Sequence, residues 1–402
     1  MTSGFLLLLL VIITALAFDF TNGFHDTANA MATSIATKAL RPRAAVMLCA
    51  SLNLVGAFLS VNVALTVTNA VIRIQNPDGT PSPELLSDGG TPLLTILLAG
   101  LVGGILWNIF TWMKGLPSSS SHALFGGLVG ATIAGIGMAG VNWVGDGTKL
   151  DGVVGKVVVP SLISPVIAIL VATLGTSVVL RITKGVAQRY VDAGFRWGQV
   201  GGASLISLSH GTNDAQKTMG VITLALIASG HWHTTDAIPT LVKVACALAI
   251  ASGTYIGGWR IIRTLGKGLV DISPAQGMAA DTSSAAVILA SSHFGFALST
   301  THVATGSILG SGIGRPGAQV RWGVVGNMAV AWLTTLPAAA VVGAVTWFVA
   351  DTLGGDVGGL AIFLIMVAIA ALMFARAQQR PIGSHNVNEE WGATPQPTGA
   401  RV

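Results

Sequence analysis

Charged residues are scarce in this chain. Asp, Glu, Lys and Arg make up 9% of its 402 residues, whereas 52% are hydrophobic. Soluble domains carry about 25% charged residues. So few ionised groups cannot cover the surface of a soluble protein of this size, and the same composition excludes an intrinsically disordered chain. The sequence therefore predicts a membrane protein.

Cysteine is scarce as well. The two cysteines, Cys49 and Cys246, both lie within apolar stretches, which argues against a disulfide framework or a zinc site. The net charge of +5 is small and lies in the connections between apolar stretches, so we expect no nucleic-acid partner. Glycine, in contrast, is abundant, with 51 residues. That content suits closely packed or broken transmembrane helices surrounded by membrane lipid.

Six apolar windows are long enough to cross a membrane, which requires about 20 residues. They are residues 43–72, 92–112, 156–181, 240–259, 322–349 and 358–376. Four further apolar stretches fit a single crossing less well and predict half-helices or re-entrant hairpins. They are residues 4–37, 118–138, 198–230 and 301–314. We therefore expect an all-α polytopic membrane protein with roughly 10–12 membrane segments.

Basic residues fall in alternate connections between these windows, for example at Arg41 and Arg43. Because Lys and Arg accumulate in cytoplasmic loops, we expect a multi-pass protein of the plasma (inner) membrane with its N-terminus outside and its C-terminus inside. The predicted organisation has four parts. They are a first membrane repeat at 1–180, a basic cytoplasmic linker at 181–197, a second membrane repeat at 198–378, and a polar, disordered cytoplasmic tail at 379–402.

Two motifs occur once in each half of the chain. The run from Asn22 through Asp26 to Asn29 is matched 188 residues later by the run from His210 through Asp214 to Lys217. A Ser/Thr cluster at 118–121, followed by His122, is matched at an offset of 180 by the cluster before His302. The first copy leads to a basic connection and the second to a nearly neutral one, which predicts that the halves are inverted in the membrane. Inverted repeats with broken helices are typical of secondary transporters.

Asp26 and Asp214 are ionisable residues inside apolar stretches, where a lone charge is costly and requires a partner. On a helix, Asp26 and Asn29 share one face with Thr33 and offer oxygen atoms that hard cations prefer. In the second copy Lys217 replaces the asparagine and can pair with Asp214. The alternative is that both carboxylates only cap helix N-termini.

The Ser/Thr clusters precede small-residue runs that predict helix starts. Their candidate ligands are Ser120, Ser121, Thr300 and Thr301. Hydroxyls, unpaired N–H groups and the positive end of a helix dipole suit a tetrahedral oxyanion, phosphate or sulfate, better than a carboxylate. The alternative is that these hydroxyls cap helices or join helices by hydrogen bonds.

Other polar residues accompany these motifs. Histidines at neutral pH relay protons, but a buried histidine is more often a neutral hydrogen-bonding residue. The histidines are His25, His122, His210 and His302, of which we select His25, His122 and His302 as secondary candidates together with Asn22 and Asn213. Asp19 and Asp281 are further acidic candidates, and Asp281 is equally well explained as a helix cap.

The two copies of the first motif resemble the signature of the inorganic phosphate transporter (PiT) family, a Gly-x-x-Asp-x-x-Asn-like run in each half. Here the copies run from Gly23 to Asn29 and from Gly211 to Lys217. The resemblance covers nearly the whole chain. It implies two inverted repeats, symport of inorganic phosphate, no cofactor, no fixed metal site, and a homodimer.

The departure from the family pattern is Lys217, because sodium-coupled members carry a second Asn at this position. With His25 and the Gln216–Lys217 pair, the chain is similar to the bacterial low-affinity branch, which moves phosphate with protons, often as a neutral complex with Mg or another divalent metal. The resemblance implies that Asp26, Asn29 and Asp214, with Lys217, belong to the cation- or proton-coupling region. It assigns the four hydroxyl residues of the Ser/Thr clusters to phosphate.

Four other functions stay open at this point. A sodium-coupled phosphate symporter or a sulfate permease would have the same fold. A channel is less consistent with an inverted repeat. An intramembrane hydrolase could use Ser121 and His122, although adjacent residues on a helix point about 100° apart and do not form a nucleophile–base pair by themselves.

Overall fold

The computed structural model describes residues 4–61, 63–64, 71–73, 83–145, 151–234, 237–294, 298–389 and 391. Within these residues the fold is helical, with two isolated β-bridges and no strand. The helices of the first half are α1 (Phe5–Ala36), α2 (Pro42–Gly56), α4 (Pro83–Leu86), α5 (Thr91–Lys114), α6 (Ser120–Ile136) and α7 (Val159–Ile182). Those of the second half are α8 (Gln188–Ala228), α9 (Thr240–Ile256), α10 (Trp259–Arg263), α11 (Pro274–His293), α12 (Thr300–Ile313), α13 (Trp322–Leu353) and α14 (Gly355–Ala377). The all-α prediction is confirmed.

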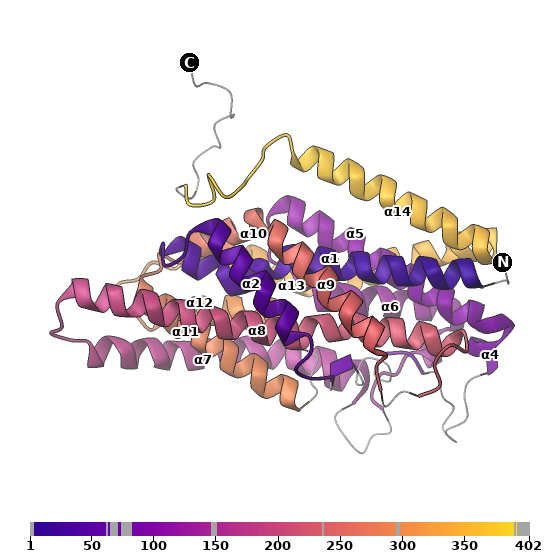
Figure 1. The fold of residues 1–402 in the computed structure, drawn as a ribbon, viewed down its shortest axis with the longest axis horizontal. Helices are drawn as coiled ribbons and strands as arrows, with labels where there is room; N and C mark the ends of the chain where they lie inside the picture. Colours follow the sequence, from indigo (N-terminus) through magenta and orange to yellow (C-terminus); the bar gives the residue numbers. More distant parts are fainter. Residues whose placement is uncertain are drawn as a thin grey trace.

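Short 3₁₀-helical and π-helical segments lie next to several of these α-helices. They are the 3₁₀ turns η1 (Asp88–Gly90) and η2 (Met138–Gly140) and the π-helical turns η3 (Val154–Val158) and η4 (Thr264–Gly268). Most long helices run roughly along one axis of the molecule, and α14, in yellow, lies along one edge (Figure 1).

Helices long and apolar enough to cross a membrane coincide with five of the six predicted windows. Four of them are single helices: the segments that contain α5, α7, α13 and α14. The fifth, predicted at 240–259, is formed by α9 and the segment Trp259–Gly268, which meet at a bend of 58°. The chain is therefore a multi-pass membrane protein, and the bent pair in its second half is a broken span or a re-entrant loop.

The predicted span at 43–72 is wrong. Helix α2 has 15 residues and ends at Gly56, after which the chain turns at residues 57–59; residues 65–70 lie outside the described part. A Cβ on Gly56 would lie 2.3 Å from the Leu208 carbonyl oxygen, so the end of α2 is set against the backbone of α8. Hydropathy indicates that a segment is buried but not where its helix ends.

Two of the four irregular stretches form long uninterrupted helices rather than half-helices. Residues 4–37 form α1, a single helix of 32 residues. Residues 198–230 belong to α8, a helix of 41 residues that begins at Gln188, so the predicted linker at 181–197 is partly helical and its boundary lies inside α8. The other two stretches form the short helices α6 and α12, of 17 and 14 residues.

The first part of the polar tail is folded, contrary to the expectation of disorder. The Gly383 amide donates to Asn386 Oδ1 at 2.7 Å, and Val387 is buried. A Cβ on Gly268 would lie 2.8 Å from the ring of Trp391, so this ring packs against Gly268. Residues 392–402 lie outside the described part.

Helices of one half pack closely on helices of the other. A Cβ on Gly23 of α1 would lie 2.3 Å from the Ile250 carbonyl oxygen of α9, and one on Gly211 of α8 would lie 2.3 Å from the Asn53 carbonyl oxygen of α2. Because glycine has no side chain, the backbones approach at these crossings. In α1–α9 the first helix of the first half meets the second helix of the other half, and in α8–α2 the halves are exchanged.

A second pair of crossings follows the same rule. A Cβ on Gly130 of α6 would lie 1.9 Å from the Ala340 carbonyl oxygen of α13. A Cβ on Gly310 of α12 would lie 2.3 Å from the Ile169 carbonyl oxygen of α7. Neither half is therefore a separate body.

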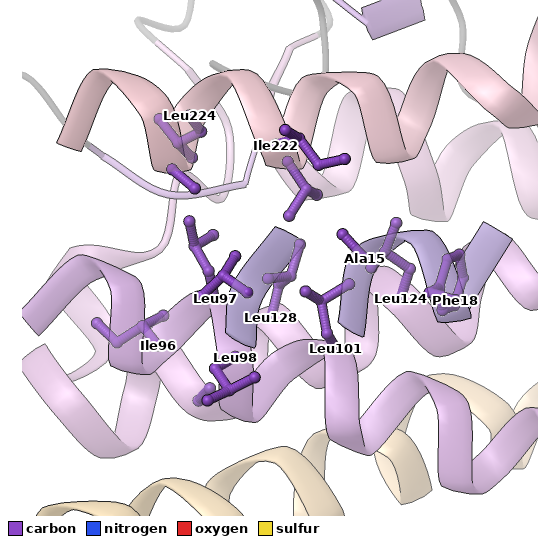
Figure 2. Packing of buried hydrophobic residues seen from close by; sticks show 14 of the residues in the cluster. Ala15, Phe18, Ile96, Leu97, Leu98, Leu101, Leu124, Leu128, Ile222 and Leu224 are labelled. Atoms are coloured by element: carbon purple, nitrogen blue, oxygen red, sulfur yellow. The ribbon is translucent and has the colours of Figure 1, made fainter. Parts of the chain in front are cut away.

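The apolar core lies beside these crossings. Figure 2 shows Phe18 of α1, Leu97 and Leu101 of α5, and Leu124 and Leu128 of α6 packed together, with side chains of α8 above them. In contrast, α7, α13 and α14 expose many large apolar side chains, among which Leu174 is 67% and Leu333 is 71% exposed. These three helices thus have extended apolar faces on the outside of the molecule.

Candidate functional site

Both Ser/Thr clusters begin a helix, as predicted. Ser119 caps α6 by accepting from the His122 amide at 3.2 Å, and Ser299 caps α12 by accepting from the His302 amide at the same distance. Because the cap uses these two side chains, the hydroxyls of the next two residues in each helix remain available for other partners.

Helix α1 connects the two helix starts. Asn29 Nδ2 donates to Thr301 Oγ1 at 3.0 Å, at the start of α12. Ser120 Oγ, at the start of α6, donates to Asp26 Oδ1 at 3.2 Å. All four side chains are at least 95% buried. The polar face of α1 thus brings the two clusters together from opposite halves of the chain.

Helix α8 completes this centre from the other side. Lys217 forms an ion pair with Asp214 and donates to Ser121 Oγ at 2.6 Å and to the Leu298 carbonyl oxygen at 3.1 Å. Thr300 Oγ1 donates to Asp214 Oδ2 at 2.9 Å. Lys217 is only 1% exposed, so its ammonium is a fixed, buried positive charge between the starts of α6 and α12.

Two histidines contact the carboxylates. His25 Nδ1 lies 2.7 Å from Asp26 Oδ1, and its Nε2 lies 3.2 Å from Thr111 Oγ1. His210 Nε2 lies 2.9 Å from Asp214 Oδ2 and 4.0 Å from Asp26 Oδ2. The sequence analysis did not select His210. The signal was its position four residues before Asp214, which places both on one face of α8.

Asp26, His210 and Asp214 form a group that could hold a cation. One ligand atom of each residue lies within 4.8 Å of the other two, and all three side chains are buried. Carboxylate oxygens and imidazole nitrogen together suit a divalent metal. This group lies at the same centre as the four hydroxyls.

The remaining predicted candidates do not join this centre directly. His122 and His302 contact each other, with ring centroids 4.8 Å apart, on the first turns of α6 and α12. Asn213 Nδ2 donates to Ser292 Oγ at 2.9 Å, toward α11. Asn22 is buried on α1.

The four hydroxyls differ in what their single protons can do. Ser120 and Thr300 donate to carboxylates. Ser121 accepts from Lys217, and Thr301 accepts from Asn29 while lying 3.4 Å from Asp26 Oδ1. Among the residues that the structure describes, no acceptor holds the proton of Ser121, and the proton of Thr301 is held only by a long contact. These two hydroxyls are therefore the ones that can donate to an anion.

Comparison with known proteins agrees with this arrangement. The model of the phosphate transporter family matches residues 22–343. The chain belongs to this family. It is similar to a Mycobacterium bovis protein named "Probable low-affinity inorganic phosphate transporter", with 57% identity over 96% of this chain and 87% of that protein. It is also similar to a Bacillus subtilis protein of the same name, with 42% identity over 86% of this chain and 97% of that protein.

A solved structure titled "The sodium-dependent phosphate transporter" has the same fold. The TM-score is 0.70 at 21% sequence identity, over 86% of this chain and 99% of that one. The family and these relatives are transporters, so the chain is not an enzyme.

Proposed function

We propose that this protein is a low-affinity inorganic phosphate symporter driven by protons. The observation that carries the proposal is the buried ammonium of Lys217, which contacts Asp214 and Ser121 at the meeting point of two helix N-termini. A fixed positive charge at this point attracts an anion. It also replaces an oxygen ligand that a sodium ion would need, and it repels that ion.

Phosphate is held between the starts of α6 and α12. Ser121 and Thr301 donate their hydroxyl protons and Lys217 supplies charge. Ser120 and Thr300 line the same site and donate to phosphate when they release the Asp26 and Asp214 carboxylates. Helix N-termini add N–H groups and a positive dipole end. The convergence of these groups from both halves in one buried centre supports this assignment.

The charges of the centre explain why phosphate needs a co-transported cation. With neutral histidines, the carboxylates of Asp26 and Asp214 and the ammonium of Lys217 leave one net negative charge. A phosphate anion adds to it, and excess charge in a buried site is costly. Protons on His25 or His210 reduce this charge. A divalent metal bound to phosphate reduces it as well, and the grouping of Asp26, His210 and Asp214 supports metal phosphate as a transported species.

Transport proceeds by alternating access between two inverted repeats. The exchanged helix crossings support this part of the proposal, since α1–α9 corresponds to α8–α2 and α6–α13 to α12–α7. The substrate then lies where the repeats meet, as in other transporters with inverted repeats.

Uptake of labelled phosphate into proteoliposomes tests the proposal. We expect uptake in sodium-free buffer with an inward proton gradient, and its loss when a protonophore removes that gradient. An absolute requirement for sodium would contradict proton coupling and show that the symporter is sodium-coupled. Without a protonophore, added Mg²⁺ should raise the rate relative to a chelator, and excess sulfate should not compete with phosphate. Efficient competition by sulfate would support the sulfate permease instead.

A further inference from the structure

Four of the aspartates that the structure describes are buried in the helical body, and they fall into two kinds. Asp26 and Asp214 each have a histidine or lysine nitrogen within 4.0 Å. Asp19 and Asp281, which are 0% and 2% exposed, have no such partner among the residues that the structure describes. The proposed transport site uses the first kind and leaves the second unexplained.

Asp281 of α11 faces uncharged groups of the neighbouring helices. Both of its carboxylate oxygens lie within hydrogen-bonding distance of Thr33 Oγ1 of α1, at 2.8 and 2.9 Å. The amide of Gln199 in α8 faces the same carboxylate, and Gln199 Oε1 accepts from Thr37 Oγ1 at 2.7 Å. One hydroxyl proton cannot satisfy two oxygens, and Gln199 Nε2 has no hydrogen-bond partner among the residues that the structure describes, so the carboxylate keeps capacity for a cation.

Two positively charged side chains at this end of the molecule donate to other groups. Lys267 Nζ donates to the Ala36 carbonyl oxygen at 3.2 Å, and Arg315 donates to Gln276 Oε1 at 3.0 Å. They do not compensate the Asp281 carboxylate.

Asp19 has a similar environment on the other side of the centre. Its Oδ1 accepts from Thr218 Oγ1 of α8 at 2.6 Å, while Oδ2 has no hydrogen-bond partner in the described part of the chain. The thiol of Cys246 in α9 also faces this carboxylate. Along α8 it faces the opposite charges of Asp214 and Lys217 at longer range, and these two form an ion pair with each other.

Helix α1 places these two carboxylates on either side of the phosphate centre. Asp19, Asp26 and Thr33 are spaced by seven residues, which returns to nearly the same helix face every 10.5 Å or so. Asp19 thus lies toward the N-terminal end of α1, and Asp281, through Thr33, lies toward the end that leads to Arg41.

An ionised carboxylate without a cation is unfavourable in a buried site, so each of these groups binds a proton unless another cation arrives. We propose that Asp19 and Asp281 bind the co-transported proton on opposite sides of the phosphate site, one before and one after phosphate translocation. This inference rests on proton coupling in the proposed function. Each carboxylate takes up one proton to become a neutral carboxyl group and releases that proton toward the other side, so one positive charge moves with phosphate.

Two assays on proteoliposomes separate this role from a structural one. Exchange of labelled for unlabelled phosphate at equal concentrations needs no net proton movement, whereas accumulation driven by a pH gradient does. The variants are Asp19→Asn and Asp281→Asn, because the amide resembles the protonated carboxyl in shape. We expect both to retain exchange and to lose accumulation and phosphate-dependent proton entry, measured with a trapped pH-sensitive dye. The control is Asp271→Asn, since Asp271 is exposed and paired with Arg321.

Retention of accumulation in either variant, or loss of exchange together with accumulation, would overturn the inference. If phosphate accumulation by the wild type does not depend on the pH gradient, the proposed proton coupling itself is wrong. If wild type responds and the variants respond equally, proton coupling stands and only this inference fails.

A second pair of variants keeps both carboxylates and removes their hydroxyl donors. Thr33→Val and Thr218→Val withdraw a hydrogen bond that favours the ionised carboxylate, so proton release becomes harder. We expect the pH at half-maximal accumulation to shift upward in both, with exchange unchanged. An unshifted pH profile in both variants contradicts the proposal even if the Asn variants fail to fold.

Discussion

Lys217 Nζ donates a hydrogen bond of 2.6 Å to Ser121 Oγ, across 96 residues of chain. The lysine lies on α8 of the second half, and the serine lies on the first turn of α6 in the first half. The same ammonium pairs with Asp214. Any movement that separates the two helices must therefore break the contact between the fixed cation and a hydroxyl that we assign to phosphate.

Removing the ammonium should destabilise the protein as well as stop transport. In Lys217→Met the buried Asp214 carboxylate loses its closest cation, and breaking a buried pair from one side costs about 3–5 kcal/mol. The double variant Asp214→Asn, Lys217→Met should recover part of this stability without recovering uptake. Thermal unfolding in detergent and phosphate uptake measure the two effects. Equal destabilisation by the single and double variants would contradict the pairing.

Neutralising either central carboxylate should abolish uptake. Asp26→Asn and Asp214→Asn keep the size of the side chain and remove the carboxylate that contacts His25 in the first case, and His210 and Lys217 in the second. Both variants should still insert into the membrane, which quantitative immunoblotting of membranes can verify. Near wild-type uptake by both would remove these residues from the mechanism, and Asp271→Asn provides the matched surface control.

The hydroxyls that can donate to an anion should matter most for affinity. Ser121→Ala and Thr301→Ala should each weaken phosphate affinity by about 1–3 kcal/mol, the cost of leaving buried hydrogen-bonding groups without a partner. Initial rates over a range of phosphate concentrations would show this as a raised apparent KM. Ser51→Ala serves as the control, because the Ser51 hydroxyl is exposed and bonds to the Met47 carbonyl oxygen. Unchanged KM values in both site variants would contradict the assignment.

The helix crossings predict a strong dependence on glycine. In Gly23→Ala and Gly253→Ala the new Cβ would lie 2.3 and 2.0 Å from carbonyl oxygens of the facing helix, which cannot yield as a flexible side chain would. We expect each to lower stability by about 1–3 kcal/mol, as for overpacked cores. Gly201→Ala in α8 has nothing within 4 Å of its Cβ and should be neutral or stabilising. Thermal unfolding of the purified variants compares them, and equal melting temperatures would refute the close crossing.

Much of this arrangement could be predicted from the sequence, because its signals are local. Apolar windows predicted α5, α7, α13 and α14, and the Ser/Thr clusters predicted the starts of α6 and α12. The pairing of Lys217 with Asp214 followed from helical spacing. Each of these depends on residues within a few turns of one another.

Features that depend on distant residues could not be predicted. The end of α2 is set by contact between Gly56 and α8, which hydropathy does not report. His210 reaches Asp26 only because α8 crosses α1. The hydroxyl of Thr33, predicted as part of the Asp26 face, in fact bonds to Asp281 in α11, 248 residues away.

The exchanged crossings also have a consequence for how the membrane protein is made. Helix α6 packs on α13 through Gly126 and Gly130, and α1 packs on α9 through Gly23. During synthesis the early helices enter the bilayer long before these partner helices have been made. Their glycine-containing faces are therefore unpaired and surrounded by lipid until then. Final assembly therefore comes late, after α13 has been inserted, and a chain truncated between the halves should remain a substrate for membrane quality-control proteases.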